Sequence, residues 1–496
     1  MPIATLTLSP LDIVVVVLFV GAILALGFSA RVRESSVLQF LAAGRTLTLP
    51  VFVATLVSTW YGGILGVGES VSYYGFGTWL LIGIPYYVFA LIYAFWLAPK
   101  VRGAEQISLP ERIASRWGKN AGLTAAILVF LLAVPAAHVL MLGVLVQQFT
   151  GWGKELSIVV ATIAGTLFLY KGGLLADVRA GILAFLMMYV GFGVIVGWCL
   201  IHHPPAATFA TIEDKKLLTF TGGQAWPAIV SFFILGAWTL VDPGFHQRVA
   251  SAASPDTGRK GVLVSVGFWF LFDVLSITTG MYALALLKPL PTDTLAIFPE
   301  LGQLVLPPGL KAVFLCGMLG TITSAMVGYT LVGGASFGRE IVGRISSLTD
   351  KEIKNWTRAG FVIVCLAAIA LAWQIQSVVA LWYAWSGCVI GAMLIPVAAA
   401  YGKRERFSPS SVVTSMIIAF GVSFGWLFYT QRTKNLFQEV AWIRIGDGWK
   451  FALPPIPESQ QANAFTFSVG TLLPGLVISA LVLGLGEAIG RRKGKA

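Results

Sequence analysis

Charged residues are scarce in this sequence. Asp, Glu, Lys and Arg make up 11% of its 496 residues, and 57% of the residues are hydrophobic. Because a soluble domain carries about 25% charged residues, this composition excludes a large soluble core and indicates a polytopic membrane protein. The net charge of +12 does not indicate a nucleic-acid partner, because Lys and Arg lie in short clusters between apolar runs, as in loops that set membrane topology.

The sequence also lacks the motifs of an enzyme. It contains no metal-ligand cluster, no phosphate-binding loop and no nucleophile elbow. The four cysteines lie far apart inside apolar runs, without the spacing of a metal site: Cys199, Cys316, Cys365 and Cys388. We therefore expect neither catalysis nor an organic cofactor, and no obligate protein partner is indicated.

Long apolar runs are what the sequence has in abundance. Windows of about 20 apolar residues predict thirteen spans, at 11–29, 49–74, 78–99, 121–149, 156–171, 174–202, 225–247, 260–287, 307–344, 358–376, 378–401, 410–430 and 466–490. The first run has no basic leader, so we predict a retained span rather than a cleaved signal peptide. No loop is long enough for a soluble domain, so residues 1–496 are predicted to form a single all-α membrane domain. The longest connection, roughly 430–464, is expected to fold over the outer mouth.

The basic residues predict an orientation. An odd number of spans places the two termini on opposite sides of the membrane. About three quarters of the 34 Lys and Arg residues fall in loops on the side of the C-terminus. By the positive-inside rule we expect a cytoplasmic C-terminus and an outer N-terminus, in a bacterial-type cytoplasmic membrane.

The stretch 49–77 is unusual for a span that faces lipid. It carries the pair Gly62-Gly63 and an ionisable Glu69 in the middle of an apolar run. Glycines weaken a helix and a carboxylate in hydrocarbon is costly, so the pattern predicts a helix that breaks in mid-membrane and lines a cavity. The alternative is that the glycines allow close helix packing.

A second interruption is predicted at Asp242-Pro243-Gly244, five spans later. Proline removes a helix hydrogen bond and glycine relaxes the turn. Two broken helices in corresponding positions indicate inverted repeats, here 49–202 and 225–401, with one helix before them (11–29) and two after (410–490). The alternative is a simple helix stop before a loop.

Four segments resemble the sodium:solute symporter family, which includes bacterial proline, pantothenate, sialic-acid and sugar symporters. They are LVSTWYGGILGVG (56–68), LPERIASRWG (109–118), GGLLADVRAGIL (172–183) and DPGFHQRVASAASPDTGRKG (242–261). The resemblance implies the thirteen-span variant of the leucine-transporter fold, with a five-plus-five inverted repeat made of spans two to six and seven to eleven.

The resemblance also implies a sodium site between the first and eighth core helices. Its ligands would be the carbonyls of Ser58, Tyr61 and Thr321 and the hydroxyl of Ser324, oxygen donors that suit a hard cation. The family usually has two adjacent hydroxyl residues here, but this chain has Ser324-Ala325. A register shift of one residue would make the pair Thr323-Ser324. Alternatively, Ser324 bonds back to its own helix.

One sodium ion per cycle is expected rather than two. In the family the Gly-Gly-Leu segment often continues to Thr-Asp, a carboxylate linked in some members to a second ion. This chain has Ala180-Gly181 there. The nearby Asp177 and Arg179 are predicted to form a pair at the inner surface.

Residues beside the breaks are candidates for contacting the solute. We select aromatic and ionisable residues inside spans: Trp60, Glu69, His138, Trp238 and Trp385. The alternatives are an interfacial position for the tryptophans and structural roles for the ionisable residues. Asp273 could bind a cationic group, carry a proton or pair internally. Asp242, His246 and Arg248 are predicted to form an ion network at an inner gate.

The sequence therefore predicts sodium-coupled symport of a small organic solute, an amino acid, carboxylate or sugar, by alternating access. Its expected partners are that solute and membrane lipids. A proton-coupled carrier that uses Glu69, His138 or Asp273 is the alternative. A membrane sensor or receptor without transport is a more distant one.

Overall fold

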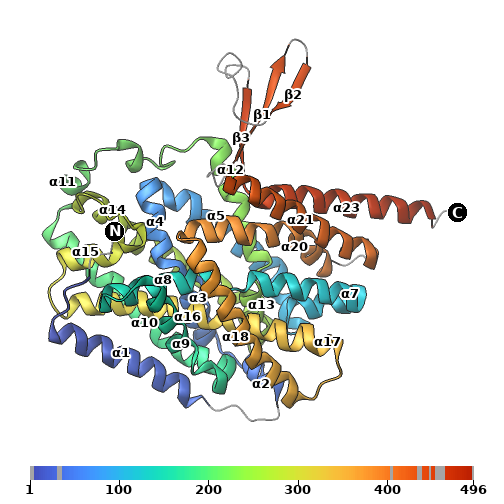
Figure 1. The fold of residues 1–496 in the computed structure, drawn as a ribbon, viewed down its shortest axis with the longest axis horizontal. Helices are drawn as coiled ribbons and strands as arrows, with labels where there is room; N and C mark the ends of the chain where they lie inside the picture. The colour runs from blue at the N-terminus through green and yellow to red at the C-terminus, as the bar shows by residue number, and fades with distance from the viewer. Residues whose placement is uncertain are drawn as a thin grey trace.

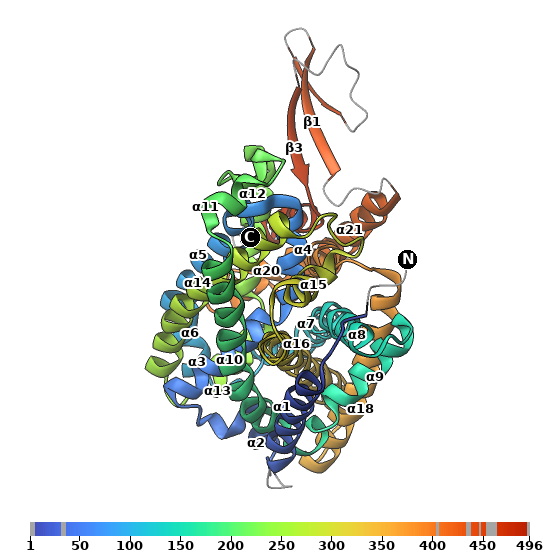
Figure 2. The same cartoon turned by 90° about the vertical axis from the view of Figure 1, so that its left-hand side faces the viewer.

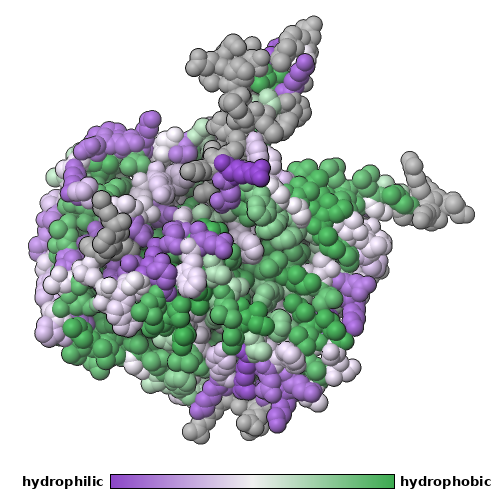
Figure 3. All heavy atoms as spheres, viewed as in Figure 1, coloured by the Kyte–Doolittle hydropathy of each residue, from purple (hydrophilic) through white to green (hydrophobic). Residues whose placement is uncertain are grey.

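The computed structural model describes residues 5–30, 36–402, 406–432, 438–445, 448–452 and 464–493, and most of them are helical (Figure 1). Within these residues, twelve helices are long and apolar enough to cross a membrane. Hydrophobic side chains form a band across the molecule, with hydrophilic side chains on either side of it (Figure 3). The chain is therefore an integral membrane protein, as its composition predicts.

The helices follow one another with short connections. The first half of the chain forms α1 (Pro10–Ser29), α2 (Val37–Ala42), α3 (Leu49–Trp60), α4 (Ile64–Tyr74), α5 (Ile84–Ile92), α6 (Ala98–Gly103), α7 (Leu109–Leu132), α8 (Ala136–Thr150), α9 (Lys154–Thr166), α10 (Leu169–His202) and α11 (Pro205–Ala210). The second half forms α12 (Trp226–Leu235), α13 (Pro243–Ser251), α14 (Pro255–Leu286), α15 (Ile297–Val305), α16 (Leu310–Ala335), α17 (Gly343–Ile345), α18 (Asp350–Gln374), α19 (Val378–Ala380), α20 (Gly387–Ala400), α21 (Pro409–Arg432) and α23 (Leu472–Lys493). Short 3₁₀ or π turns join several of them, among which are η2 (Tyr61–Gly63), η4 (Trp79–Gly83), η7 (Gly236–Leu240) and η10 (Leu381–Ser386).

The predicted count of thirteen spans is not confirmed. The predicted span 156–171 corresponds to α9, which has only 13 residues. At 1.5 Å per residue such a helix is about 20 Å long, shorter than the hydrocarbon core of a bilayer. The division into two inverted repeats stays a prediction.

The fold is mostly helical, as predicted, and a small sheet between α21 and α23 is a local exception. Three antiparallel strands form a small sheet in the order β2-β1-β3, with bounds Gln438–Ile445 (β1), Gly448–Ala452 (β2) and Ala464–Val469 (β3). β1 is rich in branched and aromatic residues, which favour strands, and Gly448 begins β2 at the hairpin. The sheet projects from the helices instead of lying flat on them (Figures 1 and 2). The proline-rich part of this connection, 453–463, lies outside the described residues.

The broken helix predicted at 49–77 lies at the centre of the molecule. In its most apolar 18-residue window, 89% of the residues are buried, against 22% for α1. It packs against α10, α14 and α16 (Figure 2). A polar and glycine-rich helix is tolerated here because protein, not lipid, surrounds it.

Both predicted interruptions are present. α3 stops at Trp60 and α4 begins at Ile64, with the single 3₁₀ turn η2 between them. α12 and η7 end at Leu240, and the chain resumes as α13 at Pro243, so the second interruption is a break in a continuing helix.

The first break is tight because it is also a packing contact. A Cβ atom on Gly62 would overlap the Cβ of Ala325 on α16, and one on Gly63 would overlap the ring of Trp382 on η10. The glycines therefore serve the break and close helix packing together, so the two interpretations of the sequence are not exclusive.

Candidate solute cavity and ion site

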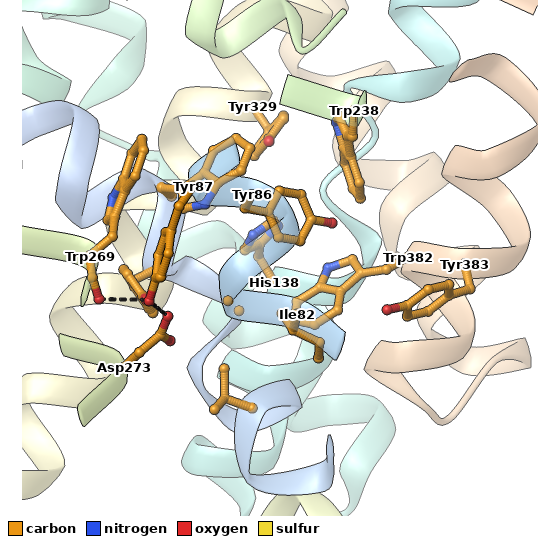
Figure 4. Close-up of a pocket in the computed structure, with 15 residues that line it drawn as sticks. Ile82, Tyr86, Tyr87, His138, Trp238, Trp269, Asp273, Tyr329, Trp382 and Tyr383 are labelled. Atoms are coloured by element: carbon orange, nitrogen blue, oxygen red, sulfur yellow. Dashed lines mark hydrogen bonds between the residues drawn. The ribbon is translucent and has the colours of Figure 1, made fainter. Parts of the chain in front are cut away.

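A cavity lies beside the break in the central helix (Figure 4). It holds about 820 Å³ of space, part of it open to solvent. Its wall comes from seven separate segments of the chain: Trp60, Tyr61, Gly63, Val67, Ile82, Gly83, Tyr86, Tyr87, His138, Trp238, Trp269, Asp273, Tyr329, Trp382 and Tyr383. Such a size and an apolar lining with few polar groups are typical of small-molecule sites.

Aromatic rings dominate this wall. The ring of Trp60 lies 5.3 Å from that of Tyr86 at an interplanar angle of 77°, and 5.5 Å from that of Trp269 at 35°. His138 stacks on Tyr329 at 5.3 Å and 22°. Rings packed edge to face hold one another in place, so the cavity has a defined shape.

Asp273 is the carboxylate of the cavity wall. It comes from α14 and its side chain is 5% exposed. The hydroxyl of Tyr87 donates a hydrogen bond to it, and that hydroxyl also accepts a hydrogen bond from Trp79 Nε1 at 3.3 Å. Tyr61 also lines the cavity and donates to the carbonyl of Trp269 at 3.0 Å.

Asp242 does not line the cavity, but it holds the wall residues Tyr329 and Trp238 by hydrogen bonds. It caps α13 by accepting from the Phe245 amide at 2.6 Å. Its other oxygen accepts from Tyr329 Oη at 2.7 Å and from Trp238 Nε1 at 3.1 Å. With three donors around it, this buried carboxylate is fully hydrogen-bonded and fixes both rings.

The structure brings three of the five predicted solute residues to the cavity. Trp60, His138 and Trp238 line it, whereas Glu69 and Trp385 do not. Glu69 is buried and accepts from Ser377 Oγ at 2.6 Å and from the amides of Val378 and Val379 at 3.1 Å. It therefore caps the N-terminal end of the helix that begins with α19.

Trp385 is also placed away from the cavity. Its Nε1 donates to the carbonyl of Leu131 at 2.9 Å, and its ring contacts Phe424 on α21. This indole therefore joins three helices.

Behind the break, hydroxyl groups from α3 and α16 converge. Ser324 Oγ lies 3.1 Å from Ser58 Oγ and 3.3 Å from Thr59 Oγ1. Ser324 thus faces α3 instead of bonding back to its own helix. These oxygens are the donor type that Na⁺ prefers. We call Ser58, Thr59, Ser324, Asp177 and Arg248 the polar cluster.

A buried ion pair completes the polar cluster. Arg248 Nη2 lies 2.7 Å from Asp177 Oδ2, and the two side chains are each 1% exposed. The same nitrogen donates to Thr59 Oγ1 at 2.6 Å. The expected surface pair of Asp177 with Arg179 is therefore wrong, because Arg179 instead donates to Ser29 Oγ at 2.8 Å.

The three residues predicted for an inner-gate network are buried but have separate partners. Arg248 pairs with Asp177, Asp242 holds Tyr329 and Trp238, and His246 Nε2 lies 2.9 Å from the carbonyl of Leu240. Within the described residues, no ion pair links these three to one another. A gating role stays a prediction.

The other predicted ion-site residues lie on the same helix, α16. Thr321 is buried, and its hydroxyl bonds back to the carbonyls of Met318 and Gly317 at 3.0 and 3.3 Å. Ala325 packs against Gly62. Thr323 and Ser324 line the same small hollow as Asp177.

The sequence interpretation did not single out three aromatic residues of the cavity wall. These residues are Tyr86, Tyr87 and Trp269. In the sequence they resemble any aromatic residue of an apolar span, and only the folded structure places them beside the cavity. Thr59 had a usable signal, since it follows Ser58 in the same polar stretch.

A model of the sodium:solute symporter family matches residues 40–401. The chain is 24% identical over 434 residues to the high-affinity proline transporter PutP of Bacillus subtilis, covering 81% of this chain and 89% of that protein. It is 22% identical over 432 residues to sodium/glucose cotransporter 4 of Danio rerio, covering 75% of this chain and 63% of that protein.

A solved structure of a Na⁺-coupled sialic acid symporter, substrate-bound and outward-open, has the same fold. The TM-score is 0.75 at 12% identity, with 97% of each chain covered. This likeness shows a leucine-transporter type of fold, as predicted, and the relatives are transporters rather than enzymes.

Proposed function

The chain belongs to the sodium:solute symporter family, and we propose that it carries a small organic solute across the cytoplasmic membrane together with Na⁺. The observation that carries this proposal is that one broken helix serves two sites. Trp60 and Tyr61 line the cavity, and Ser58 and Thr59, directly before them, belong to the polar cluster. A solute and an ion can therefore act on the same turn.

The polar cluster is the proposed ion site. Ser58 and Ser324 supply hydroxyls from facing helices, and the carbonyls of Ser58, Tyr61 and Thr321 are the further ligands that the resemblance implies. The Thr59 hydroxyl accepts from Arg248 and so is engaged within the chain. Na⁺ held between α3 and α16 would favour the state in which these helices are together. Coupling requires the ion to distinguish the two states of the transporter by about 1–3 kcal/mol.

A single ion is proposed because the cluster supplies no free carboxylate. A Cβ atom on Gly181 would lie 3.4 Å from Ser58 Oγ and 3.5 Å from Ser324 Oγ. The position that carries an acid in some relatives therefore faces the cluster, but here it is glycine. Asp177, one turn earlier, is paired with Arg248.

The orientation is proposed from the basic residues alone. We expect the C-terminus in the cytoplasm. A fluorescent protein fused to the C-terminus would fold and fluoresce there, whereas a periplasmic phosphatase fused at the same place would be inactive. The opposite result would reverse the orientation.

Thermal unfolding of the purified protein in NaCl and in KCl tests the ion. A ligand that binds only the folded state raises its stability by mass action, by about 2.7 kcal/mol at 100 times the dissociation constant. We expect stabilisation by Na⁺ over K⁺, and loss of that difference in Ser324→Ala. Ser265→Ala is the matched control, because Ser265 is also buried but, among the described residues, bonds only to Gly261 of its own helix.

The same experiment can overturn the proposal. If Na⁺ and K⁺ act alike while acidity changes solute binding, the transporter is proton-coupled. A sodium effect that survives in Ser324→Ala would place the ion elsewhere.

A further inference from the structure

The described lining of the cavity contains an acidic side chain but no Lys or Arg. Nine aromatic side chains line it, together with one carboxylate and one imidazole, and its described lining contains neither Lys nor Arg. We propose that the solute is an organic cation, a protonated amine on a compact apolar body. Its ammonium group lies against Asp273 and its body between the rings. This inference rests on the proposed function and names its substrate class.

Asp273 differs from the other buried acids of the described chain. Asp12 and Asp177 each have a cation, Lys311 at 3.4 Å and Arg248 at 2.7 Å, and Glu340 lies 2.9 Å from Arg339 and 2.5 Å from Arg344. Glu69 and Asp242 each accept from three donors within the protein.

The neighbours of Asp273 are instead two tyrosine hydroxyls, those of Tyr87 and Tyr61. A buried carboxylate without a counter-charge is costly, so its partner is expected to be a ligand.

The rings around Asp273 suit a cation. Trp60, Tyr86 and Trp269 come from three separate helices, and the ring of Trp60 lies 5.3 Å from that of Tyr86 and 5.5 Å from that of Trp269. In Figure 4, Trp269 and Asp273 lie on one side, with Trp238 and Trp382 on the other. The faces of such rings are negative and attract a positive group most strongly where water is excluded.

An anionic group would find neither Lys nor Arg in the described lining of this cavity. A carboxylate is usually bound by a basic side chain or by the free amides of a helix N-terminus. Apart from the His138 imidazole, the described lining has no basic side chain, and the start of α4 is covered because the ring of Trp382 packs on Gly63 and Gly66. The structure therefore favours an amine over an acid, a sugar acid or a phosphate.

Matched probes that differ only in charge test this inference on the whole protein. One series is 2-phenylethylamine, 2-phenylethanol and 3-phenylpropionate; the other is 3-methylbutylamine, 3-methylbutanol and 4-methylpentanoate. In NaCl we expect an amine to raise the unfolding midpoint, with the matching alcohol and acid at least about tenfold weaker. Equal shifts from the alcohols, a preference for the acids, or no shift from any amine would overturn it.

A charge-removing variant sharpens the result. Asp273→Asn should weaken amine binding by about 10- to 100-fold while keeping the stabilisation by sodium alone. The matched control is Asp12→Asn, a buried acid that pairs with Lys311 and lies outside the cavity lining; it should keep the amine shift. If Asp273→Asn does not fold, the probe series on the unchanged protein decides.

The sodium arm separates the two proposals. If Na⁺ stabilises the protein and acids or alcohols bind, the symporter proposal is supported and the amine inference is wrong. If an amine binds but Na⁺ has no effect, the amine inference is supported and sodium coupling is wrong.

Discussion

The cavity and the polar cluster share one turn of the central helix but treat charge in opposite ways. In the polar cluster, Asp177 and Arg248 neutralise each other at 2.7 Å, and each side chain is 1% exposed. In the cavity, the polar groups next to Asp273 in the described part of the chain are tyrosine hydroxyls. The cluster is balanced within the chain, whereas the cavity leaves a charge to be balanced by something that enters.

This difference separates the structural role of the Asp177–Arg248 ion pair from the binding role proposed for Asp273. A buried charge with its partner inside the protein ties helices together, here α10 to α13 and, through Thr59, to α3. A buried charge that faces a cavity, as Asp273 does, ties no helices together. It also raises the free energy of the protein while the cavity holds no ligand. The two regions should therefore respond differently when their polar groups are removed.

Removing one partner of the buried ion pair should have the largest effect. Asp177→Asn leaves the Arg248 guanidinium uncompensated, so we expect the free energy of unfolding to fall by about 3–5 kcal/mol. The apolar double variant Asp177→Leu with Arg248→Met should recover much of this loss. Unfolding of the purified protein in mixed detergent micelles measures both.

An exposed ion pair is the control for this prediction. Lys260 lies 2.7 Å from Asp256 on α14, but both side chains are more than half exposed. Because solvent screens such pairs, Lys260→Gln should change stability little. If Asp177→Asn is equally harmless, the cluster is not held by its charges and the contrast with the cavity fails.

A larger side chain in the turn that the cavity and the polar cluster share should weaken ligand binding in both regions. Gly62→Ala places a methyl group against Ala325, and such overpacking costs about 1–3 kcal/mol. Pushing α16 from the turn should also weaken stabilisation by Na⁺ and by the amine probes. Ala325→Gly in the same protein should restore part of each, as read from unfolding midpoints.

Gly21→Ala is the matched control, since an added Cβ on α1 meets nothing within 4 Å. It should leave stability and both ligand effects unchanged. If Gly62→Ala affects only one of the two ligands, the sites are less closely joined than their shared turn implies.

The break could be predicted from sequence because its signal is local. Gly62, Gly63 and Glu69 lie within one apolar run, and no lipid-facing helix explains them. The same pattern led to the wrong prediction that Glu69 contacts the solute. Its partners at Ser377 and Val379 are about 310 residues away, so its place as a helix cap could be seen only in the fold.

The partner of Asp177 was hidden for the same reason. Arg179 is its neighbour in sequence, but a helix turns successive side chains to different sides. Arg248, 71 residues away, reaches it because α13 resumes after the break at Asp242. Trp60 and Trp238 were found because they lie next to the two predicted breaks, whereas Tyr87 on α5 and Trp269 on α14 lie away from those breaks.

The smallest effects should distinguish two aromatic residues with comparable hydrogen bonds. Tyr329 donates to Asp242 at 2.7 Å in the cavity wall, and Trp385 donates to Leu131 at 2.9 Å outside it. Each loss should cost about 0.5–3 kcal/mol of stability, with the bond to the charged acceptor at the upper end. Tyr329→Phe should also weaken amine binding, because Asp242 then loses a donor and Trp238 a fixed partner, whereas Trp385→Phe should leave binding unchanged. Titration of each variant with 2-phenylethylamine measures this, and a loss of binding in Trp385→Phe alone would return Trp385 to the solute site that the sequence predicted.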